Sequence, residues 1–149
     1  IGRRSGPDTA LVSLNLTNLG AALRRLGRLA EAEAATREAL ALRGRQLGPE
    51  HPKVASTMHN LATVLREGGR YAEAESLYRV SLGVRRRALG PEHFRVAASL
   101  TGVASILQAR RQYAPAESTY REALRVYRRA LGPGHPRVGG TLHALAALL

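Results

Sequence analysis

The sequence predicts an all-α solenoid, a fold in which short helical repeats stack along one axis. The segment LGPEHPKVA at 47–55 returns as LGPEHFRVA at 89–97 and as LGPGHPRVG at 131–139, with a constant offset of 42 residues. A fixed period of this size is the signature of a solenoid, in which each repeat packs mainly on its neighbours. Between these segments apolar residues recur at spacings of three and four, which is the periodicity of a helix.

The period divides the chain into repeats at about 8–48, 49–90 and 91–132, with a half repeat at 133–149. We expect one solenoid domain over 1–149, with residues 1–7 as an irregular lead-in. Gly6-Pro7-Asp8 echoes the later loops one period earlier. The chain begins with Ile and its last residues, 145–149, are apolar, so we expect it to be a fragment of a longer chain.

Each full repeat is expected to hold two helices, and the chain to hold seven. In the first repeat they are predicted over 8–26 and 30–47, ended by Gly27 and by Gly48-Pro49. The apolar and small positions that recur at helical spacing in this repeat are Val12, Leu16, Leu19, Leu23 and Leu26, then Ala32, Ala35 and Ala39. The later repeats copy the pattern, although Arg111 stands in the turn where the first two repeats have glycine. The last helix carries Leu142, Leu145 and Leu149.

The composition limits the classes of function. The net charge of +12 comes from 22 arginines and one lysine against 11 acidic residues. Because the chain is also rich in Ala, Leu and Gly, the arginines indicate codon bias, and a nucleic acid is not the expected partner. The absence of cysteine excludes disulfides and thiolate metal sites. No apolar run reaches the roughly 20 residues of a membrane span, and no signal peptide is visible. We expect a cytoplasmic protein, or alternatively a cytoskeleton-associated one.

The repeats resemble the tetratricopeptide repeat. The matching residues are Leu19-Gly20-x-x-Leu23 with Ala32 and Ala39, Leu61-Ala62-x-x-Leu65 with Ala74 and Tyr78, and Val103-Ala104-x-x-Leu107 with Ala116, Tyr120 and Ala123. The period exceeds the family's common length of about 34 residues, and the Leu-Gly-Pro-Glu-His-Pro loop looks like the variant of kinesin light chains. The resemblance covers about 8–149. It implies a right-handed superhelix of antiparallel helix pairs, whose first helices line a concave groove for partner peptides.

The resemblance places the residues that flank the Leu-Gly/Ala element in this groove. They are Thr17, Asn18, Arg24 and Arg25, then His59, Asn60, Thr63 and Arg66, then Thr101, Ser105 and Gln108, and finally His143. Asn18 and Asn60 are expected to hold a peptide main chain, because an amide both donates and accepts hydrogen bonds. The alternative is that they face solvent or the next helix. Gly102 and Ala144 break this pattern in the second half of the chain.

The groove arginines Arg24, Arg25 and Arg66 are candidates for binding acidic side chains or a C-terminal carboxylate, since guanidinium binds carboxylates in a bidentate way. The alternative is that they are solvated residues that stabilise helix C-termini. Both interpretations stay open from the sequence.

Three ladders of charged or titratable residues repeat at the same period. Glu33, Glu75 and Glu117 each precede an arginine by four residues, which favours structural helix pairs. Arginines near helix C-termini form a basic stripe: Arg45, Arg85, Arg86, Arg87, Arg128 and Arg129. They either stabilise helix ends or bind an anionic partner. His51, His93 and His135 stand one per loop, too far apart to share a zinc ion, and are expected to fix the loops.

The function expected from the sequence is protein–protein interaction. No phosphate-binding loop and no His-Glu-x-x-His motif is present, and we expect neither an enzyme nor a cofactor or metal site. A scaffold or adaptor that binds a peptide in the concave groove is the leading hypothesis. One alternative is an anion-binding module that uses the arginine stripe for an acidic or phosphorylated tail or a nucleic acid. The other is a structural spacer in a larger assembly, such as a cytoskeletal one, self-associating through the last helix.

Overall fold

The computed structural model describes residues 7–149, so residues 1–6 of the lead-in expected at residues 1–7 lie outside the described residues, whereas Pro7 is the first residue of a helix. The described chain forms seven α-helices and no strand. They are α1 (Pro7–Arg25), α2 (Leu29–Leu47), α3 (Pro52–Glu67), α4 (Tyr71–Leu89), α5 (Phe94–Ala109), α6 (Tyr113–Leu131) and α7 (Pro136–Leu148). The predicted all-α solenoid is confirmed. The first two helices begin and end within one residue of their predicted bounds.

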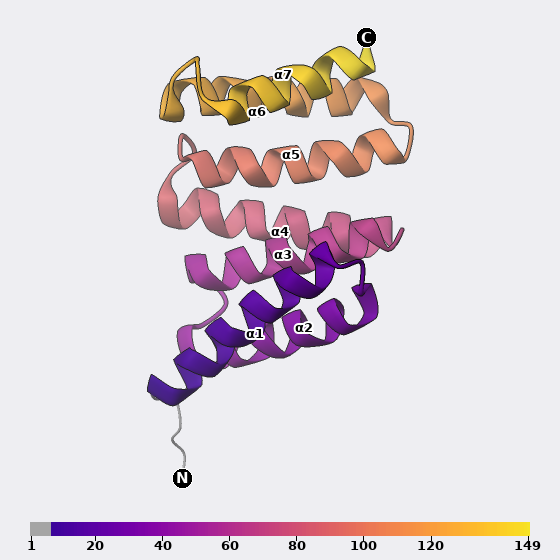
Figure 1. Ribbon diagram of the computed structural model, residues 1–149. Coiled ribbons are helices and arrows are strands. Elements are labelled where there is room, and N and C mark those ends of the chain that lie inside the picture. The colour runs from indigo at the N-terminus through magenta and orange to yellow at the C-terminus, as the bar shows by residue number, and fades with distance from the viewer. Residues whose placement is uncertain (1–6) are drawn as a thin grey trace.

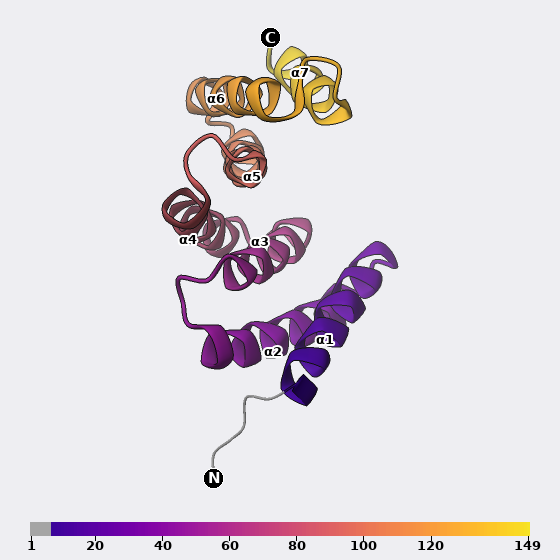
Figure 2. The same cartoon turned by 90° about the vertical axis from the view of Figure 1, so that its left-hand side faces the viewer.

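The helices form three antiparallel pairs and a single last helix, with α1 and α7 at opposite ends of the stack (Figure 1). In the view turned by 90°, α2, α4 and α6 follow one edge of the stack, and α1, α3 and α7 lie toward the other (Figure 2). Each helix packs mainly on the helices before and after it in the chain, and α3 also contacts α1 and α5. The first helices of successive repeats therefore form one continuous face.

Each loop between repeats contains a glycine with a positive φ angle and a histidine that caps the next helix. Gly48, Gly90 and Gly132 follow the helix ends with φ angles of 87°, 89° and 88°, a left-handed conformation that glycine adopts without strain. The loop histidines then cap the next helices. The Nδ1 atoms of His51, His93 and His135 accept hydrogen bonds from the backbone N–H two residues further on, at 3.0, 3.0 and 3.1 Å. The prediction that the histidine ladder fixes the loops is confirmed.

Replacing either His51 or His93 by alanine is expected to lower the free energy of unfolding by about 1 kcal/mol, because a backbone N–H at the helix start loses its acceptor. Asparagine is a good N-cap, so His51→Asn should restore most of the loss. Urea denaturation followed by circular dichroism measures the difference. His143→Ala, on the exposed surface of α7, is the control. Equal stability of His51→Ala and His143→Ala would show that the caps contribute nothing.

The turn of the third repeat keeps the geometry of the first two without their glycine. Arg111 has a φ angle of 63°, at the position where Gly27 has 78° and Gly69 has 81°. For a residue with a Cβ atom this conformation costs about 1–2 kcal/mol. The fold therefore imposes the turn on a side chain that does not favour it.

Buried side chains form three clusters along the stack, between successive helix pairs. The small residues expected to allow close helix packing, Ala32, Ala35 and Ala39, are all buried. In the second repeat Leu61 and Tyr78 are also buried. The core is thus continuous along the axis, as in a solenoid.

The apolar positions of α1 are much less buried than their equivalents in later repeats. Val12 and Leu19 are 46% and 49% exposed, whereas Val54 and Leu61, one period later, are 2% and 0% exposed. The preceding helix pair covers the later positions, and no described helix precedes α1. The helical period predicted from the sequence is therefore correct, but only tertiary packing determines which face of each helix is covered.

The predicted Glu–Arg pairs are confirmed. Arg37, Arg79 and Arg121 contact the glutamates four residues before them at 2.8, 2.8 and 2.7 Å. Arg70 and Arg110 also reach back to Glu33 and Glu75 of the preceding repeat, at 2.7 and 3.1 Å. These surface pairs each contribute a few tenths of a kcal/mol at about neutral pH.

Candidate functional site

The face formed by the first helices of the repeats contains two adjoining hollows. The first hollow has a volume of about 350 Å³ and is lined mainly by α1, α3 and α5. The second hollow has a volume of about 280 Å³ and is lined by α5, α6, α7 and the end of α3. Arg66 and Thr101 line both hollows. We refer to the two together as the groove.

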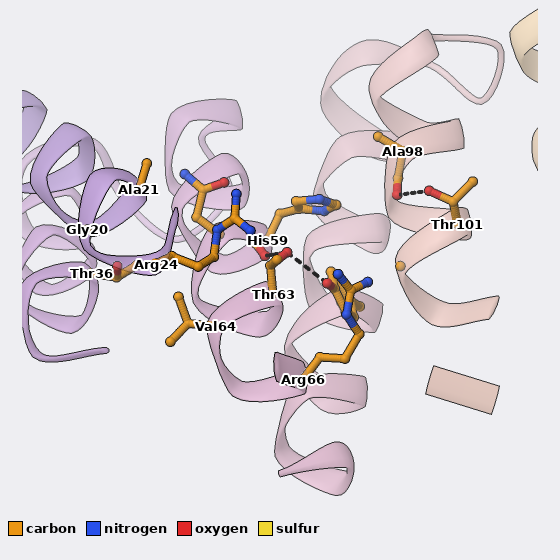
Figure 3. Close-up of a pocket in the computed structure, with 13 residues that line it drawn as sticks. Gly20, Ala21, Arg24, Thr36, His59, Thr63, Val64, Arg66, Ala98 and Thr101 are labelled. Carbon is orange, nitrogen blue, oxygen red and sulfur yellow. Dashed lines mark hydrogen bonds between the residues drawn. The ribbon is translucent and has the colours of Figure 1, made fainter. Parts of the chain in front are cut away.

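Six of the predicted peptide-binding residues line the first hollow (Figure 3). They are Arg24, His59, Asn60, Thr63, Arg66 and Thr101. Ser105 lines the second hollow. The remaining predicted residues, Thr17, Asn18, Arg25, Gln108 and His143, line neither hollow. The family resemblance thus points to the face that contains the hollows. Most of the predicted residues that line them come from the middle of the chain.

The two asparagines predicted to act together are not brought together. Asn60 lines the first hollow, whereas Asn18 is exposed on α1 and does not line it. Gly102 occupies the equivalent position on α5 and is buried in the wall of the hollow. A Cβ atom on Gly102 would come within 2.5–2.9 Å of three ring atoms of Tyr78. The Tyr78 ring therefore takes the space that a side chain at position 102 would need.

Tyr78 is a wall residue that the sequence analysis did not assign to the site, because it lies on the second helix of its repeat. Its hydroxyl shares a hydrogen bond of 2.8 Å with Thr63 Oγ1, and its ring meets His59 edge-on at 5.0 Å. The glycine at position 102 was the available signal, since it interrupts the asparagine pattern. Gly102 therefore marks a close approach between α4 and α5, in addition to the loss of an asparagine amide.

His59 is held neutral at the bottom of the first hollow. Burial lowers the pKa of His59 to about 3, and the positive charges of Arg85, Arg66 and Arg137 act in the same direction. The imidazole is therefore uncharged at neutral pH and, with Nδ1 accepting from Arg85, carries its one N–H donor on Nε2. Its Nδ1 atom lies 3.4 Å from the Arg85 guanidinium.

The sequence predicts that Arg85 belongs to the exposed arginine stripe, and this prediction is wrong. Its side chain is buried, at 3% exposure. The guanidinium donates to Ser99 Oγ at 2.9 Å, to the Arg95 carbonyl at 3.1 Å and to Ser56 Oγ at 3.2 Å. Burial lowers the pKa of Arg85 to about 10, so the group stays charged at neutral pH. It ties α4 to α3 and α5, beneath the groove.

The other predicted stripe residues lie on the surface, and their charge is partly offset. Arg86 pairs with Glu122 at 3.0 Å, Arg87 with Glu50 at 2.9 Å and Arg129 with Glu92 at 3.9 Å. For Arg45 and Arg128, none of the carboxylates in the described chain lies within ion-pair distance. The stripe is therefore a mixture of paired and unpaired cations.

The groove arginines differ in their partners. Arg24 is paired with Glu67 at 2.8 Å, so much of its charge is offset. Arg66 instead donates to the neutral Ser105 Oγ at 2.8 Å, and its guanidinium lies 6.0 Å from the centre of the Tyr78 ring. A neutral partner orients a guanidinium without cancelling its charge. Arg66, at the junction of the hollows, is thus available to an acidic group.

The second hollow is lined largely by residues that the sequence analysis did not assign. They are Tyr120, Tyr127, Arg137, Gly140, Thr141 and Ala144. Tyr120 and Tyr127 lie on a second helix of a repeat, and Arg137 lies at the start of α7, outside the positions that the family pattern highlights. Their convergence depends on how α6 and α7 pack.

Two further properties bear on the class of site. Among residues 7–149, no three side chains of His, Asp or Glu gather as metal ligands would. None of the helices over those residues combines the length and apolar character that crossing a membrane requires.

A search with protein-family profiles identifies the class. The profile of the tetratricopeptide repeat matches residues 9–87, 69–129 and 95–149, and the chain belongs to this family. As a tetratricopeptide-repeat array, it belongs to the class of protein–protein interaction modules. No curated protein sequence matches the chain.

Solved structures of other repeat proteins share the fold of the chain. BtubC (BKLC) from P. vanneervenii is 23% identical, with a TM-score of 0.86 over 99% of this chain and 58% of that one. A putative kinesin light chain from Podosopora anserina, described as having nearly identical TPR-like repeats, is 24% identical with a TM-score of 0.81. It matches over 90% of this chain and 64% of that one. The chain thus shares the fold of these two repeat proteins, and it spans less than two thirds of either of them.

A more distant structure contains a peptide. The first TPR domain of Spaghetti (RPAP3), solved with the HSP90 peptide SRMEEVD, is 16% identical with a TM-score of 0.61. The match covers 91% of this chain and 94% of that one.

Proposed function

We propose that the chain is a scaffold or adaptor module that binds a peptide segment of a partner protein along the groove. The observation that carries this proposal is the continuity of the two hollows through Arg66 and Thr101, on the face made by the first helices. A peptide-bound relative of the same fold supports the class of ligand. The lining combines polar side chains with the rings of Tyr78, Tyr120 and Tyr127, which gives an extended peptide both hydrogen bonds and packing surface.

The groove residues have distinct roles in this proposal. Asn60 presents an amide to the peptide main chain, and His59 adds an uncharged N–H donor beside it, because its Nδ1 atom accepts from Arg85. Arg66 attracts acidic side chains because its own partner, Ser105, is neutral. Binding is expected to tolerate varied sequences with at least one acidic position.

The test is a peptide-array screen at moderate salt with the native chain and the Asn60→Ala variant. The variant should lose about tenfold in affinity, as expected for one lost buried hydrogen bond of about 1.4 kcal/mol, while its helical content persists. Asn15→Ala, an exposed amide on α1 outside the groove, is the matched control and should bind as the native chain does.

Other outcomes would favour the alternatives. Binding that survives Asn60→Ala but disappears with added salt would place the function on the stripe of Arg45, Arg86, Arg87, Arg128 and Arg129. Absence of peptide binding together with a concentration-dependent mass would favour self-association. A hollow of about 710 Å³ beside α7, lined by Leu124, Leu142, Leu145 and Leu149 with arginines at its rim, would then be the surface to examine.

A further inference from the structure

We propose that the second hollow of the groove binds a phosphoryl group carried by a side chain of the partner peptide. This inference rests on the peptide-binding function proposed above and adds the chemistry of one subsite. The site is formed by Arg66 and Arg137, with Tyr120, Tyr127, Ser105 and Thr141 in its wall.

Two guanidinium groups face the second hollow, and both are oriented by neutral partners. Arg66 donates to Ser105 Oγ at 2.8 Å. Arg137 donates to the Tyr127 hydroxyl at 3.4 Å, with its guanidinium carbon 6.0 Å from the centre of the same ring. A guanidinium has five N–H donors, so each retains most of its donors for a ligand.

The hydroxyl groups around these arginines are arranged as acceptors. Ser105 Oγ donates its own hydrogen to the Gly102 carbonyl at 2.8 Å, and Thr141 Oγ1 donates to the Arg137 carbonyl at 2.8 Å. Ser105 is thereby left to accept from Arg66. This arrangement fixes a cation in place while leaving its charge uncompensated.

Almost all glutamates of the described chain are engaged away from this hollow. Every glutamate in the described part of the chain except Glu38 forms an ion pair with an arginine. None of the residues that line the second hollow is a carboxylate. Two cations therefore meet there with no acid of the described chain to balance them, and the ligand must bring the negative charge.

Charge and shape favour a phosphoryl group over a carboxylate. A phosphorylated side chain carries about −1.5 to −2 charges and three acceptor oxygens, which match two guanidinium groups, whereas a carboxylate carries one charge. Tyr120 and Tyr127 supply apolar walls for the carbon stem. Gly140 leaves room at the opening, since a Cβ atom there would touch nothing within 4 Å.

The experiment uses three degenerate peptide libraries that differ only at a central position occupied by phosphoserine, serine or glutamate. For the native chain we expect phosphoserine peptides to bind at least about tenfold more tightly than their serine counterparts, as for charge-assisted hydrogen bonds. The preference should fall below about threefold in Arg137→Gln and in Arg66→Gln, because each variant loses one of the two charges that face the ligand. Thermal melting of each variant checks that it remains folded.

Arg95→Gln is the matched control. Arg95 holds the equivalent position one repeat earlier, at the second residue of α5, stacks on Phe94 at 5.3 Å and does not line the hollow. It should keep the full phosphoserine preference. Loss of the preference in Arg95→Gln as well would show a general charge effect and overturn the assignment.

The outcomes separate the inference from the proposed function. Equal binding of phosphoserine and serine peptides, with binding still reduced by Asn60→Ala, would overturn the phosphoryl subsite and leave the peptide groove intact. Glutamate peptides that bind as tightly as phosphoserine peptides would replace it with a carboxylate subsite. No binding of any library would overturn both proposals.

Discussion

Replacing Arg85 by alanine is expected to lower the free energy of unfolding by about 3 kcal/mol. The change removes four hydrogen-bond contacts from a charged donor, and a hydrogen bond to a charged group is worth about 1.5–3 kcal/mol. It also empties a volume that is now filled by a side chain with 3% exposure. The partners that lose their donor are Ser99, Ser56, His59 Nδ1 and the Arg95 carbonyl.

The net effect is smaller than the sum of these losses, because the substitution also removes a buried charge. Burial lowers the pKa of Arg85 to about 10, which shows that the folded state disfavours the charged form. None of the carboxylates in the described chain forms an ion pair with Arg85, and its Nε atom is buried with no hydrogen-bond partner. The removed charge therefore offsets part of the loss.

Arg86→Ala is the matched control, one residue along the same helix. Arg86 is exposed and pairs with Glu122 at the surface, so its removal should change stability by no more than about 0.5 kcal/mol. Chemical denaturation of both variants gives the comparison. Arg85→Met, which keeps most of the packing volume, separates the contributions of packing and hydrogen bonding. Equal stabilities of Arg85→Ala and Arg86→Ala would contradict the buried position.

Replacing Gly102 by alanine is expected to lower the free energy of unfolding by about 2 kcal/mol, the usual cost of overpacking a core position. The new Cβ would lie within 2.5–2.9 Å of three atoms of the Tyr78 ring. That ring cannot move freely, since it is 1% exposed and its hydroxyl is bonded to Thr63. The clash outweighs the roughly 1 kcal/mol that alanine gains over glycine inside a helix.

The same substitution at Gly140 is expected to raise the stability instead of lowering it. Gly140 lies within α7, and a Cβ atom added there would meet nothing within 4 Å, so the variant should gain about 0.5–1 kcal/mol in stability. Thermal or urea unfolding of the two variants measures the difference. A stabilised Gly102→Ala would show that Tyr78 moves away at little cost, and the wall of the first hollow would then be adjustable.

The features that could be predicted are those encoded by neighbouring residues. The 42-residue period, the apolar spacing and the Gly-Pro-x-His loops are local signals, and they located the helices of the first repeat to within one residue. The histidine caps and the Glu–Arg pairs are also local, since each joins residues two or four apart. The family pattern pointed to the face with the hollows because repeats of one kind place equivalent positions on one face.

The features that could not be predicted depend on contacts between different repeats. Arg85 and Arg86 are adjacent and chemically identical, yet one is buried between α3 and α5 and the other faces solvent. Arg137 and Arg66 are 71 positions apart, and their meeting at one hollow follows from how α7 packs on α6. By itself the sequence determined the repeat, its helices and its class. Only the tertiary structure decided which arginines have no glutamate partner. The neighbouring repeats determine which side chains are buried and which ones come together at one hollow.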